Sequence, residues 1–484
     1  MRDLVKAAAS VATVAITAGL TVAYIGPRVT IGSAITACAV LLGGLVLFRR
    51  RLFLATSLRM RPASSALDRE RPSVFTEMLF LLLLSGPPML RARDPVASLH
   101  GEIDAVVIFQ LLVWGLAGIW ILFQLYSRRV NDGLLAQFWL PQKLGLGLVL
   151  CLGCSALVSP APLFTVFKVY QMTTLLFFGF LFVKYYGVET CLDRLLRGYT
   201  ILCVGAVMFA LIAPEVVLNP STEGSFPRLR GDLYAPIGTV TVFAIALLLA
   251  NPPAISKPVF LVMLGLFATL LVLSQTRAAY VSISIFVILA LVRRPKVATL
   301  RRFLWAIPAS IVMLTLTGLM PYVTRWIVRE PGTASDLGGR VELWSYVSDA
   351  VLKKSPLIGL GYYSAARILS LEFAPNIGNA HSGFIEVLVG GGILSLAVLA
   401  LLWCVLIGHI LKLLSRKNDR LSFAASSLLP LIFLMAAGGW GDFDSGPLAL
   451  TFWCLAAMLP LLQHRFERVR YPGTADAYRP IAPS

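Results

Sequence analysis

Residues 383–407, GFIEVLVGGGILSLAVLALLWCVLI, form an apolar run with a single charged residue, long enough to cross a bilayer as a helix. The whole chain shares this character: 58% of its 484 residues are hydrophobic, 14% are charged, and the mean hydropathy is +0.81. Soluble domains have about a quarter charged residues. We therefore predict an all-α polytopic transmembrane helical bundle of about 14 helices. The other predicted spans lie near residues 7–25, 29–48, 73–90, 105–125, 144–158, 163–183, 199–217, 237–250, 259–273, 278–292, 303–322, 421–437 and 447–463.

The distribution of basic residues predicts the orientation of the bundle. The chain has 42 Lys and Arg against 24 Asp and Glu, a net charge of +18. This positive charge lies in short loops between apolar runs, which favours control of topology and speaks against nucleic acid as a partner. With the N-terminus inside, most basic residues fall on the inner side, with dense groups in 49–72 and 293–302. We therefore expect both termini in the cytoplasm.

We expect a three-part organisation of the chain. Residues 1–72 would form two helices and a basic cytoplasmic stretch, residues 73–463 a polytopic membrane domain, and residues 464–484 a cytoplasmic tail. The N-terminus is similar to a signal peptide but has no clear small-residue cleavage site, so we expect a retained helix. Cys151 and Cys154 form a CxxC pattern inside an apolar run, where buried packing is a better interpretation than a redox or zinc site.

Two outer loops are long, at 218–236 and at about 323–382, and a loop of the second length inside a compact bundle is usually functional. Within it, Val341, Trp344, Val347 and Val351 recur at helical spacing, and Ser355-Pro356 ends the run. This pattern predicts a short amphipathic helix along the outer interface, with its aromatic residues near headgroup level. The glycines have structural interpretations: Gly390, Gly391 and Gly392 would let helices approach closely, and Gly359 and Gly361 would turn the loop.

His381 is the candidate general base. It lies where the long outer loop enters the span at 383–407, and the dipole at a helix N-terminus favours the neutral imidazole that a base requires. The alternative is a capping polar residue at the interface. The other histidines, His100, His409 and His464, are interpreted as exposed or solvated residues without a role.

Arginines on the same predicted side are candidates for binding an anion. Arg277 lies at an outer turn, Arg228 and Arg230 lie in the shorter outer loop with Tyr234 after them, and Arg340 opens the amphipathic helix. Several guanidinium groups beside a histidine suit a diphosphate leaving group and an acceptor hydroxyl. A snorkelling role at the membrane surface is the alternative for Arg277. No outer cluster has metal-ligand spacing, so we expect no metal and no cofactor.

Four segments, in order, resemble the O-antigen ligase family, which includes related exopolysaccharide and O-antigen polymerases. RLRGDLYAPIG at 228–238 is similar to its Arg–Gly–Phe–Asn segment, although Ala235 and Pro236 replace the usual His/Pro–Asn pair. LSQTRAAY at 273–280 is similar to its Ser–x–Ser–Arg turn, with Thr276 where Ser is usual.

The remaining two segments are the more specific ones. GGRVELWSYVSDAVLKKSPLIGLGYYS at 338–364 resembles the start of the family's large periplasmic loop. HSGFIEVLVGGGILS at 381–395 resembles its motif of His-Ser/Asn, nine residues and Gly-x-x-Gly, with Ser395 replacing the last glycine. The resemblance covers roughly 144–463 and leaves the first two predicted helices as an added portion.

The resemblance implies glycan transfer, without a metal, at the periplasmic face of a bacterial inner membrane. The donor would be a glycan on undecaprenyl diphosphate, and the acceptor a lipid A-core sugar for a ligase or another glycan for a polymerase. His381 would activate the acceptor hydroxyl, and Arg277 and Arg340 would hold the diphosphate. Arg230 is a weaker candidate for that task, and Arg228 and Tyr234 are expected to bind substrate. Membrane lipids and a polysaccharide assembly complex are the further expected partners.

The sequence is also compatible with two other classes of protein. A polysaccharide flippase or other transporter can also have many spans, but it would be expected to show two related halves and charges in mid-helix. A structural partner in an envelope complex would tolerate a change of His381.

Overall fold

The chain is described here from a computed structural model, and the positions of its helices follow from the apolar runs. The predicted spans near 7–25, 29–48 and 303–322 lie outside the described residues, as does the loop from 323 to 339. The structure describes residues 72–85, 105–127, 137–212, 218–219, 228–229, 234–250, 256–274, 276–293, 340–374, 380–414, 419–438 and 443–470.

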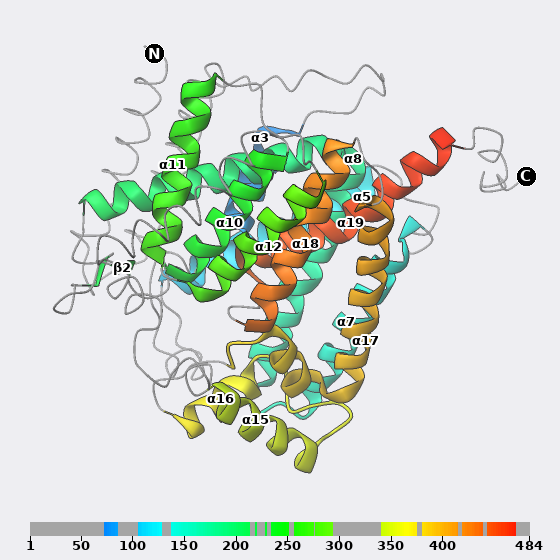
Figure 1. Ribbon diagram of the computed structural model, residues 1–484. Helices are drawn as coiled ribbons and strands as arrows, with labels where there is room; N and C mark the ends of the chain where they lie inside the picture. Colours follow the sequence, from blue (N-terminus) through cyan, green and yellow to red (C-terminus); the bar gives the residue numbers. More distant parts are fainter. Residues whose placement is uncertain are drawn as a thin grey trace, which may run out of the picture.

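The described residues are almost entirely helical, which confirms the predicted fold class (Figure 1). A two-residue antiparallel ladder, with Leu218 opposite Leu229, is an addition that the sequence did not predict. The elements are α3 (Val74–Ser85), α5 (Ala105–Ser127), α7 (Leu140–Cys154), the 3₁₀ turn η2 (Ser155–Leu157), α8 (Pro162–Ile212), β1 (Leu218–Asn219), β2 (Arg228–Leu229), α10 (Tyr234–Ala250), α11 (Lys257–Ser274), α12 (Arg277–Arg293), α15 (Arg340–Lys354), α16 (Ser364–Phe373), α17 (Gly383–Leu414), α18 (Arg420–Gly438) and α19 (Gly446–Arg470).

Within the described ranges, six helices are long and apolar enough to cross a membrane: α5, α7 with η2, α8, α17, α18 and α19. Shorter apolar helices are α3, α10, α11 and α12. α8 is interrupted at Gly187, whose φ of 83° is non-helical, so it comprises two helices that correspond to the predicted spans 163–183 and 199–217. The chain is therefore a multi-pass membrane protein, and the number of 14 helices stays a prediction.

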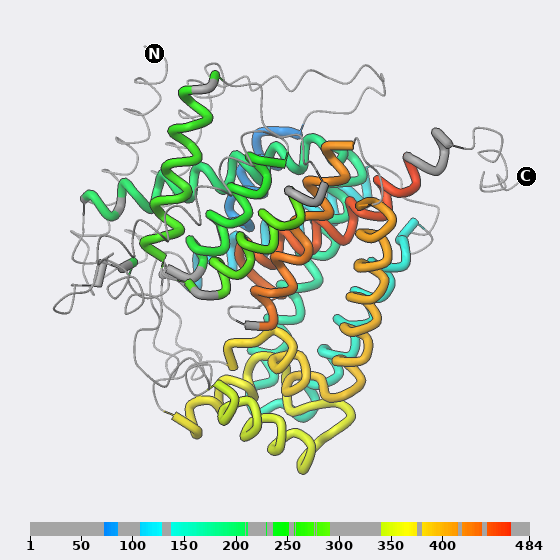
Figure 2. The backbone as a smooth tube through the Cα atoms, viewed as in Figure 1, coloured from blue at the N-terminus to red at the C-terminus, as the bar shows by residue number. Residues whose placement is uncertain are grey.

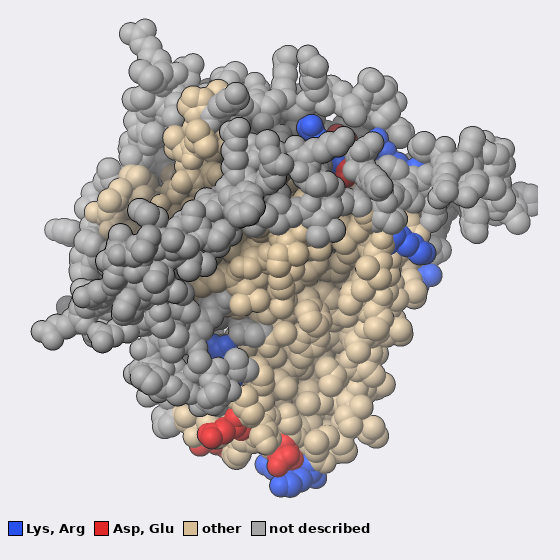
Figure 3. Space-filling model, viewed as in Figure 1, with Lys and Arg blue, Asp and Glu red and all other residues tan. Residues whose placement is uncertain are grey.

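The bundle is built around α8 and α19, which pack along each other and bury large aromatic side chains such as Phe178 and Trp453. α17 packs against α7 and α18, while α10 lies between α11 and α18. Figure 2 shows α17 beside α7 along one side of the bundle. In Figure 3 the charged side chains of the visible described surface lie mainly at two ends, with a broad uncharged belt between them. Such a belt is the surface that hydrocarbon requires.

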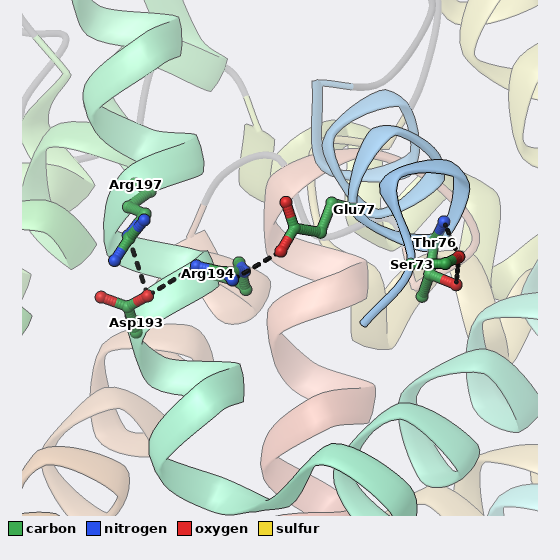
Figure 4. Close-up of polar contacts among 6 residues, drawn as sticks. All are labelled: Ser73, Thr76, Glu77, Asp193, Arg194 and Arg197. Carbon is green, nitrogen blue, oxygen red and sulfur yellow. Dashed lines mark hydrogen bonds and ion pairs between the residues drawn. The ribbon is translucent and has the colours of Figure 1, made fainter. Parts of the chain in front are cut away.

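One end of the bundle, here called the opposite end, is held by an ion-pair network (Figure 4). Arg194 of α8 lies 2.5 Å from Glu77 Oε1 of α3 and 2.8 Å from Asp193 Oδ2, and Arg197 Nε lies 2.8 Å from the same Asp193 oxygen. Arg465 of α19 lies 3.9 Å from Glu189 Oε1, which precedes Asp193 by one turn of α8. These residues belong to segments that the charge distribution assigns to the inner side, and the structure groups them together.

Candidate functional site

At the other end of the bundle, α15 and α16 lie across the start of α17 (Figure 1). We call α15, α16 and residues 383–391 of α17 the cap. It has a small core of its own, to which α15 contributes Leu343, Val347 and Val351. The remaining core members come from α16 and α17: Ala365, Ala366, Leu369 and Val389.

The predicted amphipathic helix is confirmed, and it ends at Lys354, directly before Ser355-Pro356. Its buried face differs from the prediction. Val341 is 48% exposed, whereas Leu343 is buried, because the buried stripe follows the spacing of four residues from Leu343 through Val347 to Val351. Trp344 is half-buried, and its indole N–H donates to the carbonyl of Ala380 at 2.7 Å, while its place near headgroup level stays a prediction.

The loop after α15 fits into a break in α17. Gly392 has φ 69° and ψ −168°, so α17 comprises two helical parts that meet at this residue. Leu360 N donates to Val389 O at 2.8 Å, and Ile393 N donates to Pro356 O at 2.8 Å. The loop therefore satisfies backbone groups that the break removes from the helix.

The glycines of the break serve two contacts. A Cβ at Gly391 would stand 2.8 Å from Leu152 Cδ2 of α7, which agrees with the predicted close approach of helices, whereas Gly390 and Gly392 face the loop. Gly390 lies against the loop rather than against another helix, since a Cβ there would stand 2.7 Å from the Cα of Tyr362. A Cβ at Gly359 would stand 2.5 Å from Gly390 O. Gly359 and Gly361 have φ of 73° and 114°, which confirms that they turn the loop.

His381 occupies the junction between the cap loop and α17. Its φ of 52° is unusual for a residue with a side chain, so the surrounding contacts must hold it there. The preceding residue is fixed from both sides: Ala380 N donates to Glu386 Oε1 at 2.8 Å, and Ala380 O accepts from Trp344. Glu386 is buried on the first turn of α17. Trp344 and Glu386 thus fix the backbone next to His381, and the sequence analysis predicted neither contact.

The site favours a neutral imidazole. Burial lowers the pKa of His381 to about 4 from an ordinary value of 6.5, and the positive charge of Arg340 lowers it as well. The sequence argument expected the same neutral form from the helix dipole, but burial and Arg340 are the causes in the structure. The structure therefore brings together two of the predicted catalytic residues, one from the start of α15 and one from the start of α17.

The turn with Arg277 lies at the same end of the bundle as His381. Phe384, near the start of α17, has its ring centroid 5.5 Å from that of Phe433, near the end of α18. Phe423, near the start of α18, lies 6.2 Å from Phe286, in the second half of α12. α12 is thus antiparallel to α18, and its first residue, Arg277, lies at the end where α17 begins.

The shorter outer loop connects to the same turn. A Cβ on Gly238, at the start of α10, would stand 2.8 Å from Thr276 Oγ1, so α10 begins beside the turn that precedes Arg277. Tyr234 opens α10 and Arg228 lies in β2, whereas Arg230 falls outside the described residues. The structure places the backbones of Arg277, Arg228 and Tyr234, and their roles stay predictions.

A second set of cations lies beside the cap and was not singled out by the sequence analysis. Lys168 of α8 pairs with the buried Asp444, Nζ to Oδ2 2.7 Å, and lies 4.1 Å from the ring centroid of Tyr363. Arg367 of α16 lies 5.6 Å from the same ring. A lysine inside an apolar span is the signal that could have identified this group, because such residues are costly and commonly functional.

Buried hydroxyls tie the cap to the bundle. Ser159, Thr165 and Ser364 lie within 2.8–2.9 Å of one another, and Thr165 Oγ1 also donates to Tyr362 O at 3.2 Å. These bonds join the start of α8 to the start of α16. Among the residues that the structure describes, no three His, Cys, Asp or Glu are grouped so that they could hold a metal ion.

Comparison with protein families identifies the segment that holds most of this site. Residues 260–400 match the model of the O-antigen ligase family. This part of the chain is similar to the O-antigen ligase family. The match includes Arg277, Arg340 and His381 and confirms the resemblance, over a shorter range than the 144–463 expected. No curated protein and no solved structure matches the chain.

Proposed function

We propose that this protein transfers a glycan from undecaprenyl diphosphate to an acceptor hydroxyl at the periplasmic face of a bacterial inner membrane. The observation that supports the proposal is that Arg340 lies near enough to a neutral His381 to lower its pKa, inside the segment that matches the O-antigen ligase family. The acceptor is a lipid A-core sugar for a ligase, or a growing glycan for a polymerase. Both termini are proposed to be cytoplasmic, with membrane lipids and a polysaccharide assembly complex as partners.

The chemistry assigns a task to each residue. The acceptor oxygen attacks the anomeric carbon of the donor sugar while His381 takes the hydroxyl proton. The bond between that carbon and the diphosphate oxygen breaks, and undecaprenyl diphosphate leaves with the bonding electron pair. Arg340 and Arg277 stabilise the negative charge of this leaving group, and Arg228, Arg230 and Tyr234 bind the substrate. Arginines thereby take the electrostatic task of a metal ion.

The proximity of Arg340 to His381 couples donor binding to the activation of the base. A pKa of about 4 makes His381 neutral but a weak base. A diphosphate bound at Arg340 offsets the positive charge that lowers this pKa, so the pKa rises toward the range of an efficient base. The base then becomes strong only when the donor is in place. The acid limb of kcat, which reports on the donor complex, should accordingly have a higher apparent pKa than that of kcat/KM.

The test is a transfer assay with purified protein, a polyprenyl-diphosphate glycan and an acceptor glycan. Transfer is expected in chelator without added divalent ions, and magnesium-dependent recovery would contradict metal independence. A protein that moves the donor across vesicles but forms no new glycosidic bond would favour the flippase alternative.

The glycan profile of a deletion strain separates the two activities. Single repeats still attached to the acceptor, without long chains, indicate a polymerase. Loss of all attachment indicates a ligase.

A further inference from the structure

The surface of α17 changes character at Gly392. In residues 383–391 every side chain is buried or half-buried, because α15 and α16 cover this part of the helix. Beyond the break, one stripe is exposed and wholly apolar. Its members recur at helical spacing: Ile393, Leu394, Ala397, Ala400, Leu401, Cys404, Ile407 and Leu411.

The length of this stripe matches a bilayer. From Ile393 to Leu411 an α-helix rises about 27 Å, close to the ~30 Å of a hydrocarbon core. Lys412 follows directly at one end. The sequence alone placed the span at 383–407, whereas the exposed face begins and ends later, so the lipid-facing span is shorter than the apolar run of 383–414.

The other end of the stripe continues onto the loop after α15. Ile393 N donates to Pro356 O at 2.8 Å and Leu394 N to Leu357 O at 3.3 Å, which joins the two segments edge to edge. Leu357 is 67% exposed and Ile358 is 37% exposed, so the apolar surface of α17 extends over this loop.

Two lysines border that extension. Lys353 and Lys354 end α15 and are exposed directly before the apolar loop. Asp349 lies 4.0 Å from Lys353, but an exposed pair of this length contributes little and leaves the lysine able to reach another anion. Apolar residues beside snorkelling lysines match the boundary between hydrocarbon and lipid phosphate.

We infer that the loop 355–358, Lys353 and Lys354 form a lipid-contact surface whose partner is the phosphate layer of the bilayer. The hydrocarbon ends at Gly392, Leu357 and Ile358 enter it, and the two lysines bind lipid phosphates. The cap, with His381 and Arg340, then lies outside the hydrocarbon. The occupant is lipid because the patch is continuous with the lipid-facing stripe of a membrane-spanning helix. This inference does not depend on the proposed transfer.

Nitroxide depth measurements test the boundary in nanodiscs of phosphatidylglycerol and phosphatidylethanolamine. Each protein carries one cysteine in a background whose other cysteines are replaced: native Cys404, Leu394→Cys, Leu357→Cys or Ser345→Cys. Cys404 is the deep control, and Ser345, exposed on α15, is the aqueous control. Collision with oxygen should dominate at Cys404 and L394C, collision with a water-soluble nickel chelate at S345C, and L357C should be intermediate. Nickel access at L394C equal to that at S345C would overturn the inference.

The charge of the lysines is tested with the same label at position 357. The label should lie deeper with phosphatidylglycerol than with phosphatidylcholine, and Lys353→Gln with Lys354→Gln should remove the difference. Equal depths in both lipids for the wild-type lysines would remove lipid phosphate as the partner. Neither measurement involves glycan transfer, so failure here is distinguishable from failure of the proposed function.

Discussion

The two ends of the bundle use arginine in different ways. At the opposite end, Arg194 lies between the carboxylates of Glu77 and Asp193, which neutralise its charge within the fold (Figure 4). At the cap, the positive charge of Arg340 lies close enough to His381 to lower the pKa of its imidazole. Fixed carboxylates suit an arginine that holds helices together. An arginine that lies beside a histidine of shifted pKa fits the proposed role of Arg340 in binding the donor.

The largest effect is expected from His381→Ala. Loss of a general base lowers the rate of transfer about a hundred- to ten-thousandfold. Folding should be retained, because the side chain contributes little to the core of the cap. The measurement is the initial rate of transfer by purified protein. His409→Ala is the matched control, since this histidine bonds Gln463 at 2.6 Å in another part of the bundle. A wild-type rate in H381A would remove the histidine from the mechanism.

Arg340→Gln should shift the acid limb of kcat/KM to higher pH. The base must be unprotonated, so the rate falls as the pH falls through the pKa of His381, which is about 4 with Arg340 in place. Removing the positive charge removes one cause of the low pKa, and the pKa therefore rises toward its ordinary value. The check is a pH profile of both proteins. Arg194→Gln, at the opposite end, should leave the acid limb in place, and an unchanged limb in R340Q would contradict the coupling.

Trp344→Phe should cause a smaller loss. The change keeps an aromatic ring but removes the N–H that bonds Ala380 O, and one such bond is worth about 1 kcal/mol, or roughly fivefold in rate. We expect kcat to fall with KM nearly unchanged. Glu386→Gln keeps an acceptor for Ala380 N and should be milder than Glu386→Ala. Trp120→Phe is the control, because it removes an indole bond to Thr76 far from the cap. Equal losses in W344F and W120F would mean that only general packing is affected.

The smallest effect on transfer is expected from Glu77→Gln. It removes one carboxylate from Arg194 in a partly buried pair, so the free energy of unfolding should fall by about 1–2 kcal/mol. The thermal midpoint should fall while kcat at a permissive temperature stays at the wild-type value. A fall in kcat without a change in stability would show that the two ends are not separate in function.

Features that depend on local pattern were predictable from the sequence. The apolar runs predicted the positions of the helices, and Ser355-Pro356 predicted the end of α15. The motif around His381 identified the candidate base. The break at Gly392 was not predicted, since consecutive glycines in an apolar run equally fit close helix packing. Whether these glycines pack against a helix or against a loop depends on the loop at 356–361. This loop is a tertiary contact that the local sequence does not reveal. The same applies to Trp344 and Glu386, because both act on the backbone of Ala380 rather than through a motif.

The ion pair between Lys168 and Asp444 is another tertiary contact that the sequence pattern did not predict. Lys168 is a single charge in an apolar span, whereas Asp444 lies in the segment GDFDSGP at 441–447, and nothing in the spacing connects positions so far apart in the chain. The structure supplies the connection, because α8 and α19 both begin near the cap.

The break in α17 has a consequence for how the protein is made. During synthesis, residues 383–414 enter the membrane as one apolar segment, longer than the bilayer needs. The loop that occupies the break, residues 356–361, precedes this segment in the chain and is therefore synthesised before it. The carbonyls of Val389 and Gly390 thus accept hydrogen bonds from the backbone N–H groups of Leu360 and Gly361, in a part of the chain that is made before them. The kinked shape of α17 and the position of His381 at its start therefore both depend on a segment that is made earlier.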